Sequence, residues 1–317
     1  MPRLPSINCS KCEQPVPERE SGEVGTASTF EDCLRACPPC GLAWSNANTD
    51  DRSKLTTFDR NPLSFAEDIA PYISEGYEWV LANAFNIHNR TNKRRKFEMS
   101  TSEDQVTWVV FRYLQHCDML SETLGHLGIK GFSGSVRPTI LLWGVPLPQV
   151  GATLDSRDRL VEVSNALGEL RSSRSEPDVI VDAGPAGLLF IEVKLRSPND
   201  HKSSGYEHWG KYESRDSHAD WDGIKDGGLY ELARNWRIGL DMAGGRPFTL
   251  MNLLPEKTSS KELNEIDVFK SQLATLENQH EFGRKSWEDF LSAVPYVAPW
   301  LRSYLAERKL DIPNGAK

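Results

Sequence analysis

The spacing of apolar residues divides the chain into segments of helical or strand character. Large apolar side chains recur at helical spacing over Ser64–Asn86, where Pro71 predicts a kink. A Ser-Thr-Ser-Glu-Asp sequence, which favours a helix start, precedes an amphipathic pattern that begins at Glu103. Continuous apolar residues then predict a strand at Thr139–Val145, and Arg157–Leu170 has the pattern of a helix or a helical loop.

The second half of the chain continues with further strands and helices. Its apolar runs and turn residues predict strands at Val179–Val181, Leu188–Leu195 and Phe248–Leu254, a helix at Leu229–Met242, and more helices within residues 260–280 and 285–308. The order from Glu103 onward is therefore α-β-(α)-β-β-α-β followed by helices. This order predicts one α/β domain with a central sheet.

Composition and charge restrict the class of protein. Of the 317 residues, 38% are hydrophobic and 26% are charged. The longest apolar run, Thr139–Pro148, is about half as long as a membrane-spanning helix requires, and the N-terminus lacks the pattern of a secretory signal. We therefore expect a cytoplasmic protein without a membrane partner. The net charge of -8 excludes proteins that hold nucleic acid through bulk positive charge, but it allows a local basic groove or a metal-assisted site.

The cysteines indicate a small metal-binding module at the N-terminus. Cys9 and Cys12 form one C-x-x-C pair, and Cys37 and Cys40 form a second. Two such pairs can surround one Zn²⁺ ion tetrahedrally, and a module this small would hardly fold without the metal. We therefore predict a zinc-ribbon-like module with structural zinc over residues 1–45. Cys33 is close enough in sequence to replace one ligand, and the alternative is an unmetallated tail with reactive thiols.

Residues 46–100 are predicted to connect this module to the main domain, which spans residues 101–317. Asn46–Pro62 is polar and has the composition of a linker, and the helical pattern described above follows it. The basic cluster Asn89–Lys96 contains Arg94 and Arg95, which are candidates for contact with a phosphate backbone. The alternative for this cluster is a solvated turn.

The strongest chemical pattern lies around one predicted turn. A Gly-Pro-Ala-Gly sequence separates the strands that follow Asp178 and that contain Glu192, which predicts an antiparallel hairpin. If the turn centres near Pro185, Asp178 lies opposite Glu192. Lys194 is two residues further along the strand and therefore points to the same face as Glu192. Two carboxylates and one ammonium should thus meet at one end of the sheet.

This set of groups is typical of metal-assisted phosphodiester hydrolysis. Asp178 and Glu192 would supply hard oxygen ligands to Mg²⁺, and the carbonyl of Val193 could complete the coordination shell. The ion would activate a water and offset the negative charge of the transition state. Lys194 would orient the attacking water or help to deprotonate it, and would stabilise charge on the phosphate.

Pro177-Asp178, followed after a hairpin by Glu192-Val193-Lys194, resembles the PD-(D/E)XK superfamily of restriction-endonuclease-like nucleases. The resemblance covers roughly half of the chain. It implies an αβββαβ core with a central mixed sheet, to which this chain adds the zinc module and C-terminal helices. It also implies a deoxyribonuclease that uses Mg²⁺ or Mn²⁺, and we expect it to act as an endonuclease.

The same resemblance implies roles for residues outside the hairpin. Many members of the superfamily carry a further metal-binding glutamate on the first core helix, and Glu103 matches that position, with Asp104 as a substitute. Members often carry polar groups on the helix after the E-x-K strand. Tyr230, Arg234 and Asn235 occupy that helix here and are candidate substrate contacts.

A long segment, Ser197–Gly228, follows the E-x-K strand and contains almost no aliphatic residues. It holds His201, His208 and His218 together with several aromatic residues. We interpret it as a substrate-facing lid or recognition loop, because loops of this length in a compact domain are functional or disordered. Plain disorder is the alternative.

The function best supported by the sequence is a Mg²⁺-dependent nuclease acting on DNA, in restriction, defence or repair. One alternative is a catalytically idle nuclease-like fold that serves as a nucleic-acid or protein-binding module. Another is a different hydrolase that uses the histidine-rich loop. The choice between DNA and RNA, and between a homodimer and a partner protein, stays open.

Overall fold

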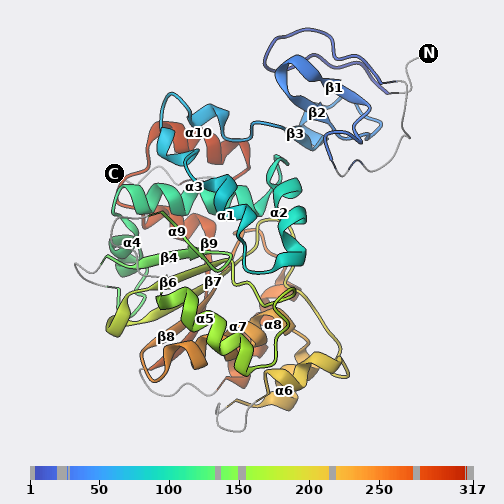
Figure 1. Ribbon diagram of the computed structural model, residues 1–317. Coiled ribbons are helices and arrows are strands. Elements are labelled where there is room, and N and C mark those ends of the chain that lie inside the picture. Colours follow the sequence, from blue (N-terminus) through green and yellow to red (C-terminus); the bar gives the residue numbers. More distant parts are fainter. Residues whose placement is uncertain are drawn as a thin grey trace. The chain divides into compact units, whose positions relative to one another are not determined.

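The structure is a computed structural model that describes residues 4–19, 27, 29–132, 137–148, 155–213, 219–273, 279–310 and 312 (Figure 1). The chain forms two compact units. The first unit contains residues 1–75 and 91–106, and the second contains residues 76–90 and 107–317. No helix in the described part of the chain is long and apolar enough to cross a membrane.

The chain has a mixed α/β architecture. The strands of the described residues are β1 Arg35–Cys37, β2 Leu42–Trp44, β3 Thr57–Asp59, β4 Thr139–Leu142, β5 Val145–Pro146, β6 Val179–Asp182, β7 Leu188–Val193, β8 Phe248–Leu254 and β9 His280–Ser286. The α-helices of the same residues are α1 Tyr77–Ala82, α2 Arg90–Phe97, α3 Glu103–His116, α4 Leu120–His126, α5 Asp155–Ala166, α6 Trp221–Gly227, α7 Tyr230–Ala243, α8 Ser260–Gln272, α9 Trp287–Ser292 and α10 Pro299–Glu307.

The first unit is built on an antiparallel sheet in the order β1-β2-β3. Residues 46–62, which we expected to be a polar linker, include β3. The reason is that Phe58 is fully buried and pairs with Ala43 of β2, so this segment completes the sheet. The buried guanidinium of Arg35 fixes the neighbouring loop, since it donates to the carbonyl oxygens of Ser45, Ala47 and Thr49 over 2.7 to 3.0 Å.

The segment Ser64–Asn86 does not form the single kinked helix that we expected. It contains two short 3₁₀ turns, Ser64–Ala66 and Pro71–Ile73, before α1 begins at Tyr77. Pro71 has no N–H to donate to a continuing helix, and Gly76 has a left-handed φ of 81°. The apolar residues therefore lie on short helical turns, which do not join into one continuous helix.

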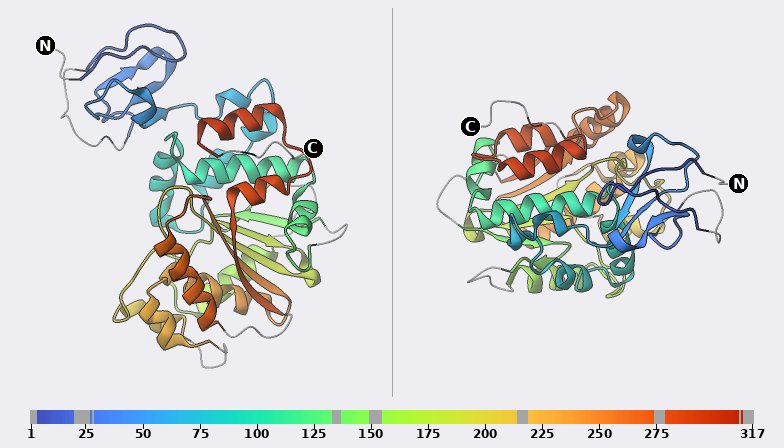
Figure 2. Two further views of the ribbon diagram at one scale, coloured as in Figure 1. Left: turned by 180° about the vertical axis from the view of Figure 1, so that it is seen from behind. Right: turned by 90° about the horizontal axis from the view of Figure 1, so that it is seen from above.

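The second unit contains a six-stranded mixed sheet in the order β5-β4-β6-β7-β8-β9. β6 runs antiparallel to both of its neighbours, β4 and β7. β8 runs parallel to β7, and β9 runs parallel to β8. Figures 1 and 2 show helices on both faces of this sheet, which explains why every residue of β7 and β8 is buried. Strands covered on both faces favour continuous apolar runs, and such runs identified both strands in the sequence.

Alternate residues of the strands face different helices. Ile180, Phe190 and Leu250 belong to one buried cluster with residues of α5, α7 and α8. The opposite face is covered by α3, α9 and α10 (Figure 2), which contact one another through the ring pairs Phe111–Phe290 and Tyr113–Trp300. Because side chains alternate along a strand, Glu192 and Lys194 point towards the α7 face.

Two strand predictions needed correction. The predicted strand Thr139–Val145 is a tight hairpin, because Trp143 and Gly144 have φ values of 51° and 72° and reverse the chain between β4 and β5. Helices were predicted within residues 260–280 and 285–308, and residues 281–284, which lie between them, form the centre of β9. Only Phe282 of that edge strand is buried, so β9 shows none of the alternation that marks a half-buried strand.

The contact between α7 and β8 predicts a sharp difference between two glycine substitutions. A Cβ atom added at Gly239 would overlap the ring of Phe248, whereas nothing lies within 4 Å of a Cβ atom added at Gly283. Gly239→Ala should lower the free energy of unfolding by about 1–3 kcal/mol, and Gly283→Ala should change it by less than about 0.5 kcal/mol. Urea unfolding of both variants tests this packing, and equal stabilities would contradict it.

Candidate active site and cysteine metal centre

The β6–β7 hairpin brings the predicted acidic pair together. Val179 pairs with Ile191 in the antiparallel register, and the turn at Gly184–Ala186 closes the hairpin. Continuing that register by one residue places Asp178 beside Glu192, as the sequence predicted. The Oδ2 atom of Asp178 accepts a hydrogen bond from the backbone N–H of Val193 at 2.9 Å, so its carboxylate is fixed at the end of β7.

Glu192 is almost completely buried, and both of its carboxylate oxygens have partners. Its side chain is 2% exposed. Oε1 accepts from Nζ of Lys194 at 2.7 Å, and Oε2 accepts from Nδ2 of Asn235 on α7 at 2.7 Å. Each carboxylate oxygen has a second lone pair, so these contacts orient the group without exhausting its capacity to bind a cation.

Lys194 lies between two carboxylates. Its Nζ atom donates to Oε1 of Glu192 and to Oε2 of Glu231, each over 2.7 Å. An ammonium has three N–H groups, so one remains for a further acceptor. Lys194 also lines a surface cavity of about 470 Å³. A group bound in that cavity could therefore accept the third hydrogen bond.

Burial and neighbouring charge determine the protonation of this cluster. Burial, together with the negative charges of Asp178 and Glu231, raises the pKa of Glu192 well above its ordinary value. Burial opposes the charged form of Lys194, but the nearby carboxylates outweigh that effect and raise the pKa of Lys194 above its ordinary value. Lys194 therefore stays an ammonium at neutral pH. In this state it can orient a water and stabilise negative charge.

Glu231 is a member of the cluster that sequence reasoning missed. It lies in the first turn of α7, and its Oε1 atom is 3.6 Å from Nη2 of Arg234. Burial opposes its ionised form, but Lys194 and Arg234 outweigh burial and lower the pKa of Glu231 to about 2. An acidic residue at the start of the helix after the E-x-K strand was the available signal. Its pairing with Lys194 depends on how α7 packs on β7.

The three candidate substrate contacts on α7 have different surroundings. Asn235 is fully buried and donates to Glu192. Tyr230 packs edge-on against Trp209 and Tyr212, with ring centroids 5.0 and 5.8 Å away. Arg234 lies beside Glu231 and over the ring of Tyr230. Asn235 and Arg234 therefore belong to the same cluster as Lys194, and contact of any of the three with a substrate stays a prediction.

The described residues of the segment 197–228, which are 197–213 and 219–228, include regular structure. They contain a 3₁₀ turn at Glu207–Lys211 and the helix α6, and their Trp209, Tyr212 and Trp221 side chains join the core cluster. The interpretation as a substrate-facing lid stays a prediction. His201 pairs with Glu265, and His208 pairs with Glu207, so these two histidines do not share a site. His218 lies outside the described residues. The aromatic residues Trp209, Tyr212 and Trp221 thus contribute to the hydrophobic core of the second unit.

The remaining candidates lie in the first unit. Glu103 opens α3, and Arg94 and Arg95 lie on α2. Arg95 donates to Oδ1 of Asn92 at 3.3 Å. Because these residues belong to a different unit from Asp178, their assignment to the metal or to the substrate stays a prediction.

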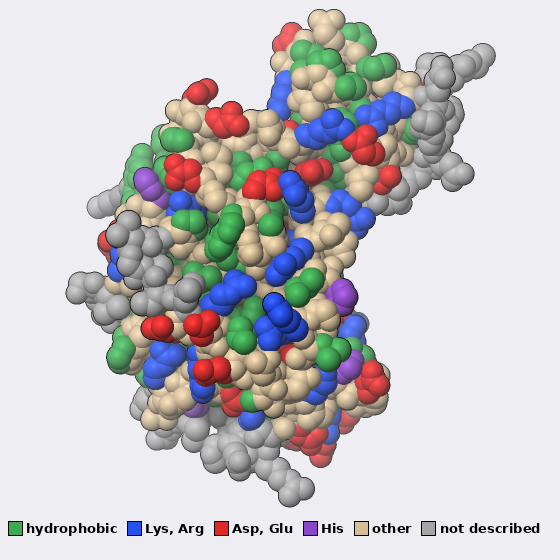
Figure 3. Space-filling view, in the orientation of Figure 1, with side chains coloured by type: hydrophobic (Ala, Val, Ile, Leu, Met, Phe, Trp, Pro, Cys, Tyr) green, Lys and Arg blue, Asp and Glu red, His purple; other side chains and the backbone are tan. Residues whose placement is uncertain are grey.

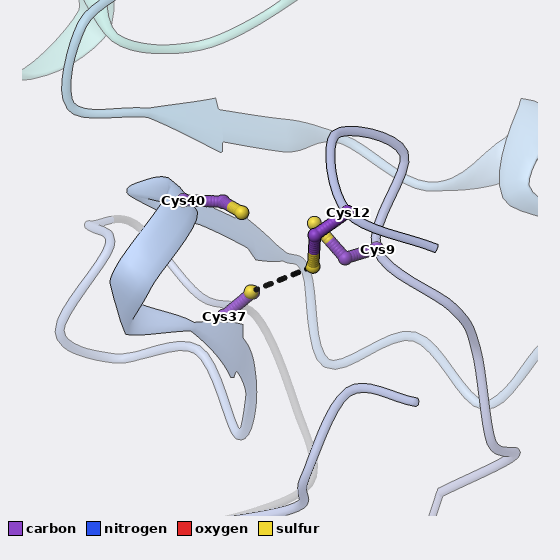
Figure 4. A group of neighbouring side chains, drawn as sticks. All are labelled: Cys9, Cys12, Cys37 and Cys40. Atoms are coloured by element: carbon purple, nitrogen blue, oxygen red, sulfur yellow. Dashed lines mark hydrogen bonds between the residues drawn. The ribbon is translucent and has the colours of Figure 1, made fainter. Parts of the chain in front are cut away.

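The four cysteines of the two C-x-x-C pairs form one cluster (Figure 4). The Sγ atoms of Cys9, Cys12, Cys37 and Cys40 lie within 4.8 Å of one another, close enough to hold one metal ion. The second pair is positioned by the tight connection between β1 and β2. Four thiolates at this spacing match the ligand set of a structural zinc. Among the described residues, this is the one group of three or more such donors within that distance.

Cys33 is not part of this cluster. It is buried beside Phe30 and Phe58, and its Sγ atom donates to the carbonyl oxygen of Thr29 at 3.3 Å. Burial raises the pKa of the Cys33 thiol to about 12. The open alternative in which Cys33 replaces a metal ligand is therefore not the arrangement observed.

No protein-family model, curated protein or solved structure matches this chain. The functional argument therefore rests on the geometry of the two sites.

The lowered pKa of Glu231 predicts a pH-dependent stability difference. An acid whose pKa falls from 4.5 to about 2 on folding stabilises the fold above pH 4.5, and this contribution disappears as the pH falls through 2. Glu231→Gln should therefore lower the free energy of unfolding by about 2 kcal/mol at pH 7, and the difference should shrink between pH 4.5 and 2. Denaturant unfolding across this range measures it.

Glu281→Gln is the matched control, because Glu281 is exposed on β9 and makes no ion pair with another described residue. It should follow the wild type at every pH. A difference between Glu231→Gln and wild type that stays constant between pH 7 and 2.5 would contradict the assigned interaction.

The cysteine cluster predicts that folding of the module depends on metal. Cys37→Ser combined with Cys40→Ser should abolish the binding of one zinc per chain and expose the backbone amides of residues 4–45 to hydrogen exchange. The second unit should keep its protection. Cys117→Ser, which removes a cysteine of the second unit, should keep the zinc. Metal analysis and hydrogen exchange decide the outcome, and zinc retained by the double variant would refute the site.

Proposed function

We propose that this protein is a Mg²⁺-dependent nuclease that hydrolyses phosphodiester bonds of DNA, as its resemblance to the PD-(D/E)XK superfamily implies. The observation that carries the proposal is the position of Asp178, Glu192 and Lys194. Two carboxylates lie side by side at the end of a hairpin, the ammonium of Lys194 contacts the carboxylate of Glu192, and Lys194 also lines an open cavity.

The carboxylates of Asp178 and Glu192 are the proposed ligands of the divalent cation. Glu231, whose carboxylate contacts Lys194, does not form a group of three metal donors with them within 4.8 Å. Burial and the negative charges of Asp178 and Glu231 raise the pKa of Glu192, and a bound cation would favour its ionised form. Asp178 and Glu192 supply the hard oxygen donors that Mg²⁺ prefers. When bound there, Mg²⁺ would lower the pKa of a water and offset charge on the phosphate.

Lys194 would act on the substrate directly. Glu192 and Glu231 hold its ammonium in place and keep it charged, and its third N–H group is available to a phosphate oxygen. A fixed positive charge stabilises the additional negative charge that develops on the phosphate during hydrolysis. Asn235 would position Glu192 by holding its other oxygen.

The element order supports the same proposal. α3, β4, β6, β7, α7 and β8 occur in the order that the superfamily core has, with α4, β5, α5 and α6 inserted between them. We further propose that the cysteine cluster holds structural zinc. The chain has a net charge of -8, and the face shown in Figure 3 carries interspersed acidic and basic side chains. Binding of DNA would therefore depend on local groups.

One observation favours the alternative of a catalytically idle binding module. Both oxygens of Glu192 already have partners inside the protein, so the cluster could serve as a buried ion pair that stabilises the fold. Such a protein would bind nucleic acid or another protein without cleaving it. Metal binding at Asp178 separates the two functions.

The nuclease proposal predicts that cleavage depends on Lys194. With Mg²⁺ or Mn²⁺, pure protein should cut DNA supplied as supercoiled, linear duplex and single-stranded substrates, and EDTA should stop the reaction. Lys194→Ala should reduce the rate at least about 100-fold, because it removes a charge from the transition state. Lys270→Ala, which removes an exposed lysine from α8, should cut at the wild-type rate.

Calorimetry of Mg²⁺ binding completes this test. Asp178→Asn should lose the ion, whereas Lys194→Ala should keep it. Cleavage by Lys194→Ala at the wild-type rate would refute the assigned role. Absence of both cleavage and metal binding in the wild-type protein would favour the binding module.

A further inference from the structure

A cavity adjoins the proposed active site where the chain leaves two neighbouring strands. It has a volume of about 470 Å³ and is lined by residues 194–198 after β7, residues 254–259 after β8, and residues 308–310 after α10. Lys194 belongs both to this lining and to the carboxylate cluster. Asp178, Glu192 and Glu231 are not part of the lining, so Lys194 is the residue that the cavity and the cluster share.

The lining has an excess of positive charge. Arg196, Lys257 and Lys309 are exposed at the cavity, and none of them makes an ion pair with another described residue. Elsewhere in this unit, Lys225 and Arg246 are paired with carboxylates. Three such cations around one cavity form an unusual concentration in a chain whose net charge is -8.

Glu262 is the acidic residue of the lining. Its Oε1 atom accepts hydrogen bonds from the backbone N–H and the side-chain amide of Asn199, at 3.2 and 3.3 Å. These contacts fix the carboxylate but leave its negative charge in place, so the lining carries more positive than negative groups. The first turn of α8, which Ser259 caps, also faces the cavity, and a helix N-terminus favours an anion.

We propose that this cavity binds a phosphate group of a nucleotide, through Arg196, Lys257 and Lys309, beside the phosphate that Lys194 contacts. The volume lies in the range of small-molecule sites and accommodates a phosphate with part of its nucleoside. The proposal deepens the proposed function, on which it rests for the identity of the strand. In that setting the site would hold the backbone next to the bond that is hydrolysed.

The salt dependence of binding tests this site without catalysis. The full-length protein is titrated with a fluorescent single-stranded oligonucleotide in EDTA at several salt concentrations. The slope of log K against log salt is negative, and each lost phosphate contact reduces its magnitude by about 0.7 for a single strand. A lower slope therefore denotes a smaller magnitude. Arg196→Ala combined with Lys257→Ala should therefore lower the slope by about 1.4.

Two further variants control for charge and for folding. Arg171→Ala combined with Lys270→Ala removes the same charge from exposed positions outside the lining and should keep the wild-type slope. Lys309→Gly removes the third cation at a residue whose φ is 62°, where glycine is favoured, so it should lower the slope without loss of stability. A wild-type slope in the pocket variants together with unchanged mononucleotide binding, or an equal decrease in the control pair, would overturn the proposal.

Two further measurements, mononucleotide binding and metal-dependent cleavage, identify the source of the phosphate and test the pocket and the nuclease proposal independently. Binding of a mononucleotide that weakens in the pocket variants, with an unchanged oligonucleotide slope, would assign the site to free nucleotides. A lower oligonucleotide slope without metal-dependent cleavage by the wild type would keep the pocket and refute the nuclease. Cleavage that vanishes in Lys194→Ala, with mononucleotide and oligonucleotide binding unchanged in the pocket variants, would support the nuclease and refute the phosphate pocket.

Discussion

The second unit is organised around the burial of one ammonium among carboxylates. Charged groups removed from water require partners, and each side chain of this cluster has at least one. Lys194 contacts Glu192 and Glu231, and Asn235 holds the other side of Glu192. Removing Lys194 would leave the buried Glu192 without its cation, which costs more than the intact pair contributes. The packing of α7 on β7 is therefore constrained by charge as well as by apolar contact.

The surrounding strands and helices hold the backbone of this cluster from both faces of the sheet. Asn252 of β8 donates to the carbonyl oxygen of Glu192 at 3.2 Å, and Asn199 donates to the side chain of Asn252. On the opposite face, the indole N–H of Trp287 donates to the carbonyl oxygen of Lys194 at 3.2 Å. These contacts come from elements far apart in the sequence. They give the proposed site a rigid frame on a central strand.

Local patterns predicted the elements that local physics determines. The Gly-Pro-Ala-Gly turn was sufficient to place Asp178 beside Glu192, since the register of a hairpin follows from its turn. The two C-x-x-C pairs predicted the cysteine cluster, because two such pairs can surround one metal ion. The missed features depend on contacts across the fold. Glu231 reaches Lys194 only because α7 crosses β7, and the reversal at Trp143 requires positive φ values that no apolar pattern reveals.

The composition of β9 has a consequence for the behaviour of the protein at high concentration. β9 is the last strand at its side of the sheet in the described part of the chain, and its seven residues, His280–Ser286, include three charged side chains, those of Glu281, Arg284 and Lys285. An open strand edge can recruit an identical strand from another molecule. Charged side chains along it make such pairing costly in desolvation. These side chains therefore disfavour the pairing of β9 with the same strand of another molecule.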